Sequence, residues 1–178
     1  MSDGVNPREE NSAMSPGFSI RSCGQEDETE ILTIINESAI AYRTAVPPDR
    51  YHEPYMPRDE LRKEMTEMTF FGYEQNSRLL GVVGYQPVKD VSLVRHLYVR
   101  PERQRLGVGT KLIAHVIRLA KTRRILVGTW ETATWAIRFY EKEGFKLLPN
   151  KDSLLREYWE IPERQIGLSV VLGFEKSL

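Results

Sequence analysis

Residues 97–110 read Leu-Tyr-Val-Arg-Pro-Glu-Arg-Gln-Arg-Leu-Gly-Val-Gly-Thr. The apolar run 91–99 predicts a strand that leads into this loop, and the residues from Gly109 onward predict an amphipathic helix. Amides in the first turn of a helix lack intrahelical partners and carry partial positive charge. Because glycine has no Cβ, the backbone can approach a phosphate closely. The stretch therefore predicts an anion-binding loop between a strand and a helix.

The glycine spacing argues against two common phosphate-binding loops. A P-loop needs four residues between its glycines and then Gly-Lys-Ser/Thr, whereas one residue separates Gly107 from Gly109 and Thr110 precedes Lys111. A dinucleotide fingerprint needs a third glycine three residues later, where Leu112 stands. The loop instead resembles the acyl-CoA pyrophosphate loop of the GNAT superfamily of N-acetyltransferases, whose pattern is Arg/Gln-x-x-Gly-x-Gly/Ala.

A second stretch resembles the same superfamily. Residues 136–145 contain Ala136-x-x-Phe139-Tyr140-Glu141-x-x-Gly144-Phe145, which is similar to the family pattern Asn-x-x-Ala-x-x-Phe-Tyr-Glu-x-x-Gly-Phe. The order of glycine loop, helix, strand, helix and strand is also similar. One position departs from the pattern, because Ala133 stands where the family has Asn. A side-chain contact to the cofactor is then either absent or supplied by Thr132 or Thr134.

The composition is that of a single globular domain. The chain has 178 residues, and its 25 Lys and Arg residues balance its 25 Asp and Glu residues. This balance argues against nucleic acid or a membrane surface as the main partner. Cys23 is the only cysteine, so no intrachain disulfide forms. No apolar run approaches the roughly 20 residues of a membrane span, and no signal-peptide layout is visible, so a reducing cytoplasm is expected.

The periodicity predicts a mixed α/β (α+β) fold in one domain. Residues 1–17 are polar and are expected to be a disordered tail before the domain at 18–178. One parallel strand pair is expected around the glycine loop, and antiparallel hairpins before it. The resemblance implies a mixed central sheet flanked by helices, with two strands splayed apart at the CoA site. Helices are predicted at 28–45, 59–68, 109–121, 133–143 and 152–159, and strands at 18–22, 69–74, 79–85, 91–99, 125–129, 145–148 and 165–174.

The resemblance implies acetyl-CoA or another acyl-CoA as acyl donor, with no metal. The pyrophosphate would lie on the loop amides, and the pantetheine arm along the exposed edge of the strand, where a backbone N–H near Leu97 or Tyr98 polarises the acyl carbonyl. Arg100, Arg103, Arg105 and Lys111 crowd the loop, which favours attraction of an anion. The implied cofactor-binding residues are Leu97, Tyr98, Val99, Gln104, Arg105, Leu106, Gly107, Val108, Gly109 and Thr110.

The resemblance also assigns catalytic roles. Tyr140 occupies the position of the general acid that protonates the leaving thiolate. His52 and Glu53 are the first candidates for the general base, because the proline-rich connector 46–57 usually walls the acceptor pocket in this fold. His96 is an alternative base. Cys23 lies far from both motifs, so direct attack in a ternary complex is expected.

The acceptor is expected to be a primary amine of a small molecule or peptide. Tyr51, Tyr55 and Met56 indicate a partly apolar pocket, and Trp130 is a further candidate for its lining. A homodimer paired through sheet edges is also implied, with the last strand as a candidate edge. Two other functions stay open: a non-catalytic acyl-CoA-binding regulatory module, and an interaction domain that kept only the fold. Candidates to cover the acceptor side are Arg156, Glu157, Trp159, Arg164 and Gln165.

Overall fold

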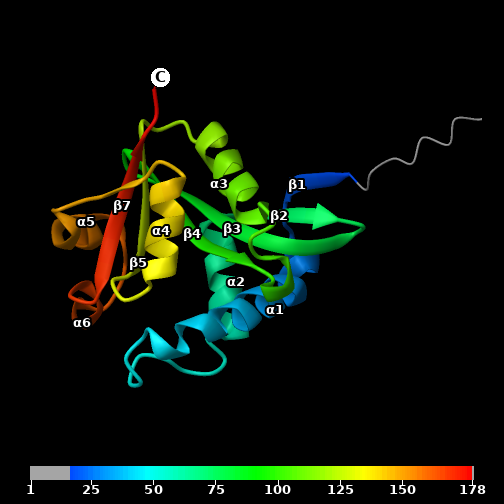
Figure 1. Ribbon diagram of the computed structural model, residues 1–178, viewed down its shortest axis with the longest axis horizontal. Helices are drawn as coiled ribbons and strands as arrows, with labels where there is room; N and C mark the ends of the chain where they lie inside the picture. Colours follow the sequence, from blue (N-terminus) through cyan, green and yellow to red (C-terminus); the bar gives the residue numbers. More distant parts are fainter. Residues whose placement is uncertain (1–16, 178) are drawn as a thin grey trace, which may run out of the picture.

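The computed structural model describes residues 17–177 (Figure 1). The tail predicted at residues 1–17 lies outside this range except for Gly17. Within the described residues the chain forms a mixed sheet of seven strands in the order β1-β2-β3-β4-β5-β7-β6. The strands are β1 (Phe18–Ser22), β2 (Thr69–Gln75), β3 (Arg78–Val88), β4 (Val91–Val99), β5 (Arg124–Trp130), β6 (Lys146–Leu147) and β7 (Ser169–Glu175).

Six α-helices and three short 3-10 helices connect these strands in the described part of the chain. The α-helices are α1 (Glu28–Ala39), α2 (Arg58–Glu67), α3 (Val108–Leu119), α4 (Thr134–Lys142), α5 (Lys151–Tyr158) and α6 (Glu163–Ile166). The 3-10 helices are η1 (Gln25–Asp27), η2 (Ile40–Thr44) and η3 (Pro101–Arg103).

The strand directions confirm the predicted mixed sheet. β1, β2, β3 and β4 pair in antiparallel fashion in chain order. The crossover through α3 brings β5 parallel to β4, as the strand–loop–helix–strand order predicts. β7 lies between β5 and β6 and is antiparallel to both. The last strand is therefore not the outermost strand of the sheet.

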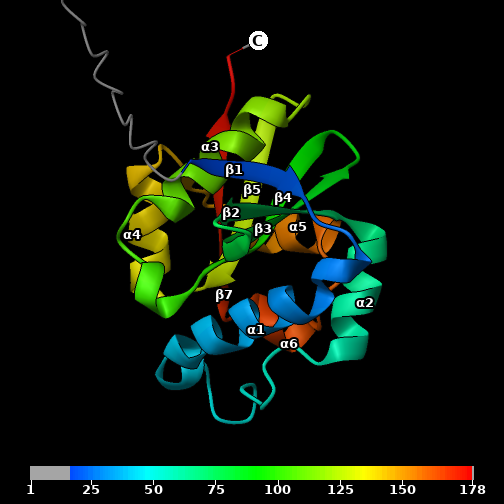
Figure 2. The ribbon, with the colours of Figure 1, turned by 90° about the vertical axis from the view of Figure 1, so that its right-hand side faces the viewer.

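Helices cover both faces of the sheet (Figure 2). One face carries α3 and α4, whose buried side chains include Leu112, Val116 and Tyr140. The opposite face carries α1 and α2 over one half of the sheet and α5 and α6 over the other. The apolar residues of α3 recur on one side of the helix, which is why this element buries them against the strands.

Two predicted elements differ most from the structure. The α-helical part of the first helix ends at Ala39, and the chain continues as the tighter helix η2 to Thr44, shortly before Pro47. The last strand begins at Ser169 rather than Gln165, because the short helix α6 follows Pro162. Across residues 17–177, no helix combines the length and apolar character needed to cross a membrane.

Candidate active site

The glycine loop starts α3 with a left-handed residue. Gly107 is the N-cap of this helix and has φ +84° and ψ 3°. A side chain rarely adopts this conformation, so glycine is favoured by the backbone itself. A Cβ built at Gly107 meets no atom within 4 Å. The backbone at this position therefore faces open space, and the residues present fit the approach of a phosphate group.

The loop side chains differ in where they point. Leu106 is 64% exposed, and Arg105 is exposed with φ 62°. Gln104 donates from Nε2 to the carbonyl of Val99 at 3.1 Å, so it ties the loop back to the end of β4. Thr110 donates from Oγ1 to Glu143 at 2.6 Å, which links the start of α3 to the end of α4.

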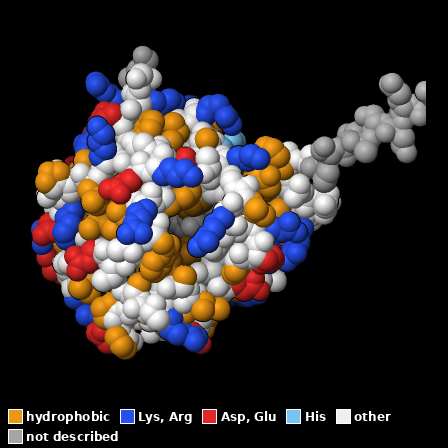
Figure 3. Space-filling view, viewed as in Figure 1, with side chains coloured by type: hydrophobic (Ala, Val, Ile, Leu, Met, Phe, Trp, Pro, Cys, Tyr) orange, Lys and Arg blue, Asp and Glu red, His pale blue; other side chains and the backbone are white. Residues whose placement is uncertain are grey.

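Arg100 does not join the expected group of basic residues around the loop. It is 5% exposed, and its Nε donates to the carbonyl of Leu79 at 2.7 Å. Its guanidinium also pairs with Glu30 and Glu37 of α1. Arg100 therefore fastens the end of β4 to α1. Other Lys and Arg side chains surround a hollow on the face that carries α3 and α4 (Figure 3), which favours an anionic ligand there.

β4 and β5 pair over only part of their length. The ladder ends at the pair Val94 and Val127, although β4 continues to Val99 and β5 to Trp130. The structure therefore has the splayed strand pair that the resemblance implies.

A bulge accompanies this separation on the other side of β4. The pairing with β3 shifts register, and His96 adopts a left-handed φ of 50°. Such bulges redirect side chains. Beyond the bulge, Leu97 and Val99 pack toward α3 and α4, whereas Tyr98 packs toward α1 and α2.

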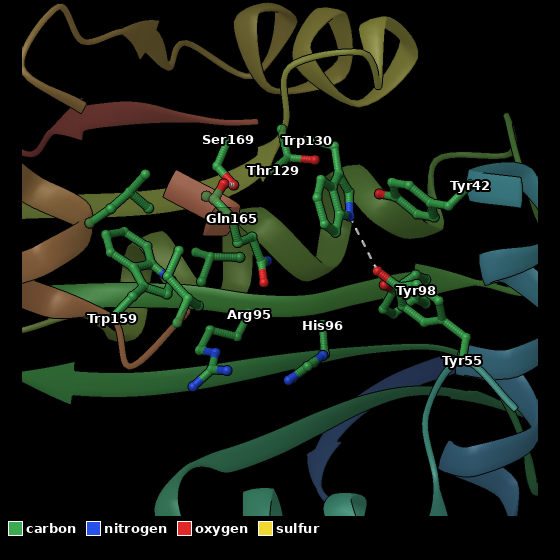
Figure 4. Close-up of a pocket in the computed structure, with 14 residues that line it drawn as sticks. Tyr42, Tyr55, Arg95, His96, Tyr98, Thr129, Trp130, Trp159, Gln165 and Ser169 are labelled. Carbon is green, nitrogen blue, oxygen red and sulfur yellow. Dashed lines mark hydrogen bonds between the residues drawn. The ribbon is translucent and has the colours of Figure 1, made fainter. Parts of the chain in front are cut away.

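A cavity of about 180 Å³ lies where the two strands part (Figure 4). Trp159 lies at one end of it and a group of tyrosines at the other. The polar and aromatic residues that line it are Tyr42, Tyr55, Arg95, His96, Tyr98, Thr129, Trp130, Trp159, Gln165 and Ser169, and its remaining wall is formed by Val94, Gly128, Leu155 and Ile161.

Four tyrosines gather around the end of β4. The rings of Tyr42 and Tyr55 stack at 5.9 Å, and Tyr42 meets Tyr98 edge-on at 6.4 Å. Burial and the nearby Tyr55 raise the pKa of Tyr42 to about 12. Burial also raises the pKa of Tyr98 and of Tyr140 above that of an ordinary phenol. These hydroxyls therefore stay protonated at neutral pH, as a proton donor must.

Tyr140 is held in the core rather than at the surface. It is 7% exposed, and its ring meets Phe139 at 5.2 Å and Phe145 at 5.6 Å. It does not line the cavity described above. Its hydroxyl lies close enough to Tyr42 and Tyr98 for their electrostatic interaction to contribute to the raised pKa values. The structure thus brings Tyr140 near the tyrosine group at the end of β4.

His96 has a carboxylate partner. Its Nε2 lies 3.1 Å from Oε2 of Glu64 on α2, and its ring stacks on Phe70 at 5.8 Å. Arg95 donates to the other oxygen of Glu64 at 3.2 Å. Burial alone would raise the pKa of Glu64, but the hydrogen bond and charge of His96 and the charge of Arg95 lower it overall. The carboxylate is therefore ionised near neutral pH and orients the imidazole.

His52 and Glu53 lie in the connector between η2 and α2, and both are exposed. His52 Nδ1 is 2.8 Å from the carbonyl of Pro54, and Glu53 pairs with Arg43. Neither side chain lines the cavity. The connector does reach it through Tyr55, whose hydroxyl accepts a hydrogen bond from Trp130 Nε1 at 3.4 Å. The base role of His52 or Glu53 stays a prediction.

Sequence reasoning missed two of the charged residues at this site. Arg95 and Glu64 come from β4 and α2, and no sequence pattern pairs them. Of the residues expected to cover the acceptor side, Trp159 and Gln165 line the cavity. Arg156 is exposed and pairs with Glu163, and neither Glu157 nor Arg164 lines the cavity.

The hydroxyl of Thr132, one of the two candidates to replace the missing Asn, donates to the carbonyl of Ala45. Ala133 itself is fully buried at the start of α4. Thr134, the other candidate, is exposed.

The model of the acetyltransferase (GNAT) family matches residues 31–145, which include both motifs and β4. The chain belongs to the GNAT acetyltransferase family. The family model covers the loop at Gly107, the splayed strands and Tyr140.

Solved structures share the fold of this GNAT chain at low sequence identity. The PaiA N-acetyltransferase of Thermoplasma acidophilum, solved in complex with coenzyme A, is 17% identical with a TM-score of 0.71 over 90% of this chain and 99% of its own. The ribosomal-protein-S18-alanine N-acetyltransferase of Escherichia coli is 18% identical with a TM-score of 0.63 over 91% and 96%. A GNAT acetyltransferase of Elizabethkingia anophelis with acetyl-CoA bound is 19% identical with a TM-score of 0.59 over 89% and 98%.

A curated relative matches a shorter segment. The UPF0157 protein YqkA of Bacillus subtilis is 33% identical over 78 residues, which are 43% of this chain and 23% of YqkA. The match thus spans about a quarter of that protein's length.

Proposed function

We propose that this GNAT protein transfers an acetyl group from acetyl-CoA to a primary amine of a small molecule or peptide. The observation that carries the proposal is the separation of β4 from β5 beyond Val94, which leaves an unpaired strand edge. The edge runs between the left-handed glycine loop on one side and the tyrosine-lined cavity on the other. A donor that binds along it would present its thioester to an acceptor in the cavity.

The loop and the strand edge supply the donor site. The amides of Leu106 to Thr110 would hold the pyrophosphate, with Gln104 and Arg105 at the rim. The backbone of Leu97 to Val99 would bind the pantetheine amides in the manner of an added strand. A backbone N–H near Leu97 or Tyr98 would stabilise negative charge on the acyl oxygen.

A base is needed because the acceptor is an ammonium ion at neutral pH. A lysine-like amine with a pKa near 10.4 is neutral in roughly one molecule in a few thousand at pH 7. We favour His96 as this base, because it lines the cavity and its Nε2 contacts the Glu64 carboxylate. His52 and Glu53 remain candidates only if the connector brings them closer when an acceptor binds.

The acetyl group passes directly from the thioester to the amine, without a covalent enzyme intermediate. The base accepts a proton from the ammonium group, and the neutral nitrogen then forms a bond to the acyl carbon. As the carbon–sulfur bond breaks, Tyr140 donates a proton to the sulfur, which leaves as the thiol. The nitrogen loses its second proton, which restores the Tyr140 phenol, and the base releases the first proton to solvent. Holding the amine and the thioester together contributes much of the remaining acceleration. Cys23 is far from this region in sequence and has its thiol pKa raised to about 12 by burial, so it is a poor nucleophile.

A regulatory acyl-CoA-binding module is the second candidate. The observation in its favour is the loss of the Asn position to Ala133, with Thr132 bonded to Ala45 instead. Sheet-edge dimerisation and a reducing cytoplasm are the assembly and location we propose for either function.

Release of the CoA thiol, measured with a panel of amines and peptides, tests the transferase. We expect acceptor-dependent release that falls in Tyr140→Phe and in Gly107→Glu. Acetyl-CoA binding without release to any acceptor, with an affinity unaffected by Tyr140→Phe, would favour the regulatory module. Transfer that both variants leave unchanged would contradict the proposed site.

A further inference from the structure

The cavity beside β4 has an aromatic wall. Five of its fourteen lining residues carry large aromatic rings: Tyr42, Tyr55, Tyr98, Trp130 and Trp159. They come from η2, the connector, β4, β5 and the end of α5, so segments far apart in the sequence build one surface (Figure 4). Aromatic rings favour stacked or edge-on contacts with other rings.

Trp159 forms the end of this wall through a contact with Gly128. A Cβ built at Gly128 would lie 3.5 Å from atoms of the indole ring, so the ring lies directly on the backbone of β5. Leu155 and Ile161 flank it in the cavity lining. Trp159, Leu155 and Ile161 therefore give this end of the cavity an apolar surface, beside which the charged side chain of Arg95 lies (Figure 4).

The cavity lining has no carboxylate that could pair with a second ammonium group on the acceptor. None of its lining residues in the described chain is Asp or Glu. The Glu64 carboxylate, which contacts two lining residues, is 13% exposed and is already paired with Arg95 and His96. Arg95 itself adds positive charge to the lining. A polyamine, which keeps one ammonium group while another reacts, would thus meet a cation without a compensating anion.

The cavity has room for one ring and a short chain. A cavity of roughly 150 Å³ accommodates benzene, and this one measures about 180 Å³. The Gln165 side-chain amide points into it (Figure 4) and has no hydrogen-bond partner identified among residues 17–177. It is available to a polar substituent on the acceptor.

We propose that the acceptor is a small primary amine carried on an aromatic ring, with the ring on Trp159 and the amine toward His96 and the tyrosines. This inference rests on the proposed acetyl transfer and names its substrate class. The aromatic wall determines which amines the cavity prefers, because it stacks with the ring of the acceptor. The lack of a free carboxylate disfavours polyamines. An extended aliphatic chain makes less contact with the ring of Trp159 than an aromatic ring does.

The test compares four acceptors at saturating acetyl-CoA: 2-phenylethylamine, 2-cyclohexylethylamine, spermidine and a lysine-containing peptide. We expect kcat/KM for 2-phenylethylamine to be at least tenfold higher than the values for spermidine and the peptide. It should also be severalfold higher than kcat/KM for 2-cyclohexylethylamine. Preference for spermidine or the peptide would overturn the aromatic acceptor while leaving acetyl transfer intact. Transfer to none of the four would overturn both proposals.

Substitution of Trp159 provides a second test of the aromatic acceptor. We expect Trp159→Leu to lower kcat/KM for 2-phenylethylamine about tenfold, mainly through KM, and to narrow the preference over 2-cyclohexylethylamine. The matched control Trp159→Phe keeps an aromatic ring and is expected to restore most of the preference. Affinity for acetyl-CoA, measured by calorimetry, is expected to stay constant in both variants. An unchanged preference in Trp159→Leu would contradict the role of this ring.

Discussion

Gly109 of α3 lies against the ring of Phe139 of α4: a Cβ at Gly109 would come within 3.3 Å of the Phe139 ring. The two residues belong to the two sequence motifs that define the candidate site. The second glycine of the loop therefore serves helix packing in this chain, whereas Gly107 serves the backbone turn. This division separates the effects expected from substituting each glycine.

Substitution of Gly109 by alanine is expected to lower stability. Alanine favours a helix by about 1 kcal/mol over glycine, but overpacking against a ring costs about 1–3 kcal/mol. We expect Gly109→Ala to lower the melting temperature by a few degrees in thermal unfolding. Gly167→Ala is the matched control, because its Cβ meets nothing within 4 Å at an ordinary φ of −61°. A Gly109→Ala protein as stable as the control would contradict the packing argument.

Gly107 is expected to matter for donor binding through its backbone conformation. Its Cβ would meet open space, so alanine there introduces no clash, but the left-handed φ costs about 1 kcal/mol for an alanine. We expect Gly107→Ala to weaken acetyl-CoA binding severalfold in calorimetry. Gly107→Asn should be milder, because asparagine tolerates this conformation better. Equal affinity in wild type and Gly107→Ala would argue against a preorganised loop.

Removal of the Tyr140 hydroxyl is expected to reduce turnover without weakening donor binding. Loss of a general acid typically costs about 10²–10⁴-fold in rate, and the ring contacts with Phe139 and Phe145 remain in phenylalanine. Because burial raises the pKa of Tyr140, the phenol stays protonated beyond pH 10, so wild-type activity should show no alkaline loss below that pH. A Tyr140→Phe enzyme with normal kcat would remove this residue from the mechanism.

The identity of the base is tested by three parallel variants. If His96 is the base, His96→Gln should lower kcat at least a hundredfold and abolish the acidic limb of the pH–rate profile. His52→Gln and Glu53→Gln, which alter exposed side chains outside the cavity, should leave that limb in place. The reverse pattern would assign the base to the connector and contradict the role of His96.

Asp27 provides a pH-dependent prediction for stability. Its carboxylate accepts two hydrogen bonds from Arg21 at 2.9 Å and one from the Gly24 amide. The Arg21 bonds lower its pKa in the folded state, and this outweighs the opposing effect of burial. A lowered pKa contributes stability above the unfolded value near 3.9, which is lost as pH falls through the folded value.

We therefore expect Asp27→Asn to cost about 2 kcal/mol at pH 7 and less at pH 3, which lies below the unfolded pKa of about 3.9. Chemical unfolding at the two pH values measures the difference. An equal cost at both would show that the charge of Asp27 contributes nothing.

The elements that carry the motifs were predictable because their signals are local. The bounds of β4 follow from its apolar run and Pro101, and α3 follows from its glycine loop and apolar stripe. The bulge at His96 has no such signal, since no glycine marks the left-handed residue. The Glu64–His96 contact joins residues 32 positions apart on two elements. Only the tertiary packing of α2 on β4 brings them together, so sequence reasoning named His96 without its partner.

The central claim is that acetyl-CoA binds along the unpaired edge of β4 and on the amides of the glycine loop. Amide chemical shifts recorded by NMR during a titration with acetyl-CoA test it most directly. We predict saturable shifts at Leu97, Tyr98 and Val99 and at residues 106–110, with smaller changes at α5 and α6. Saturation of the protein with those amides unchanged would contradict the account.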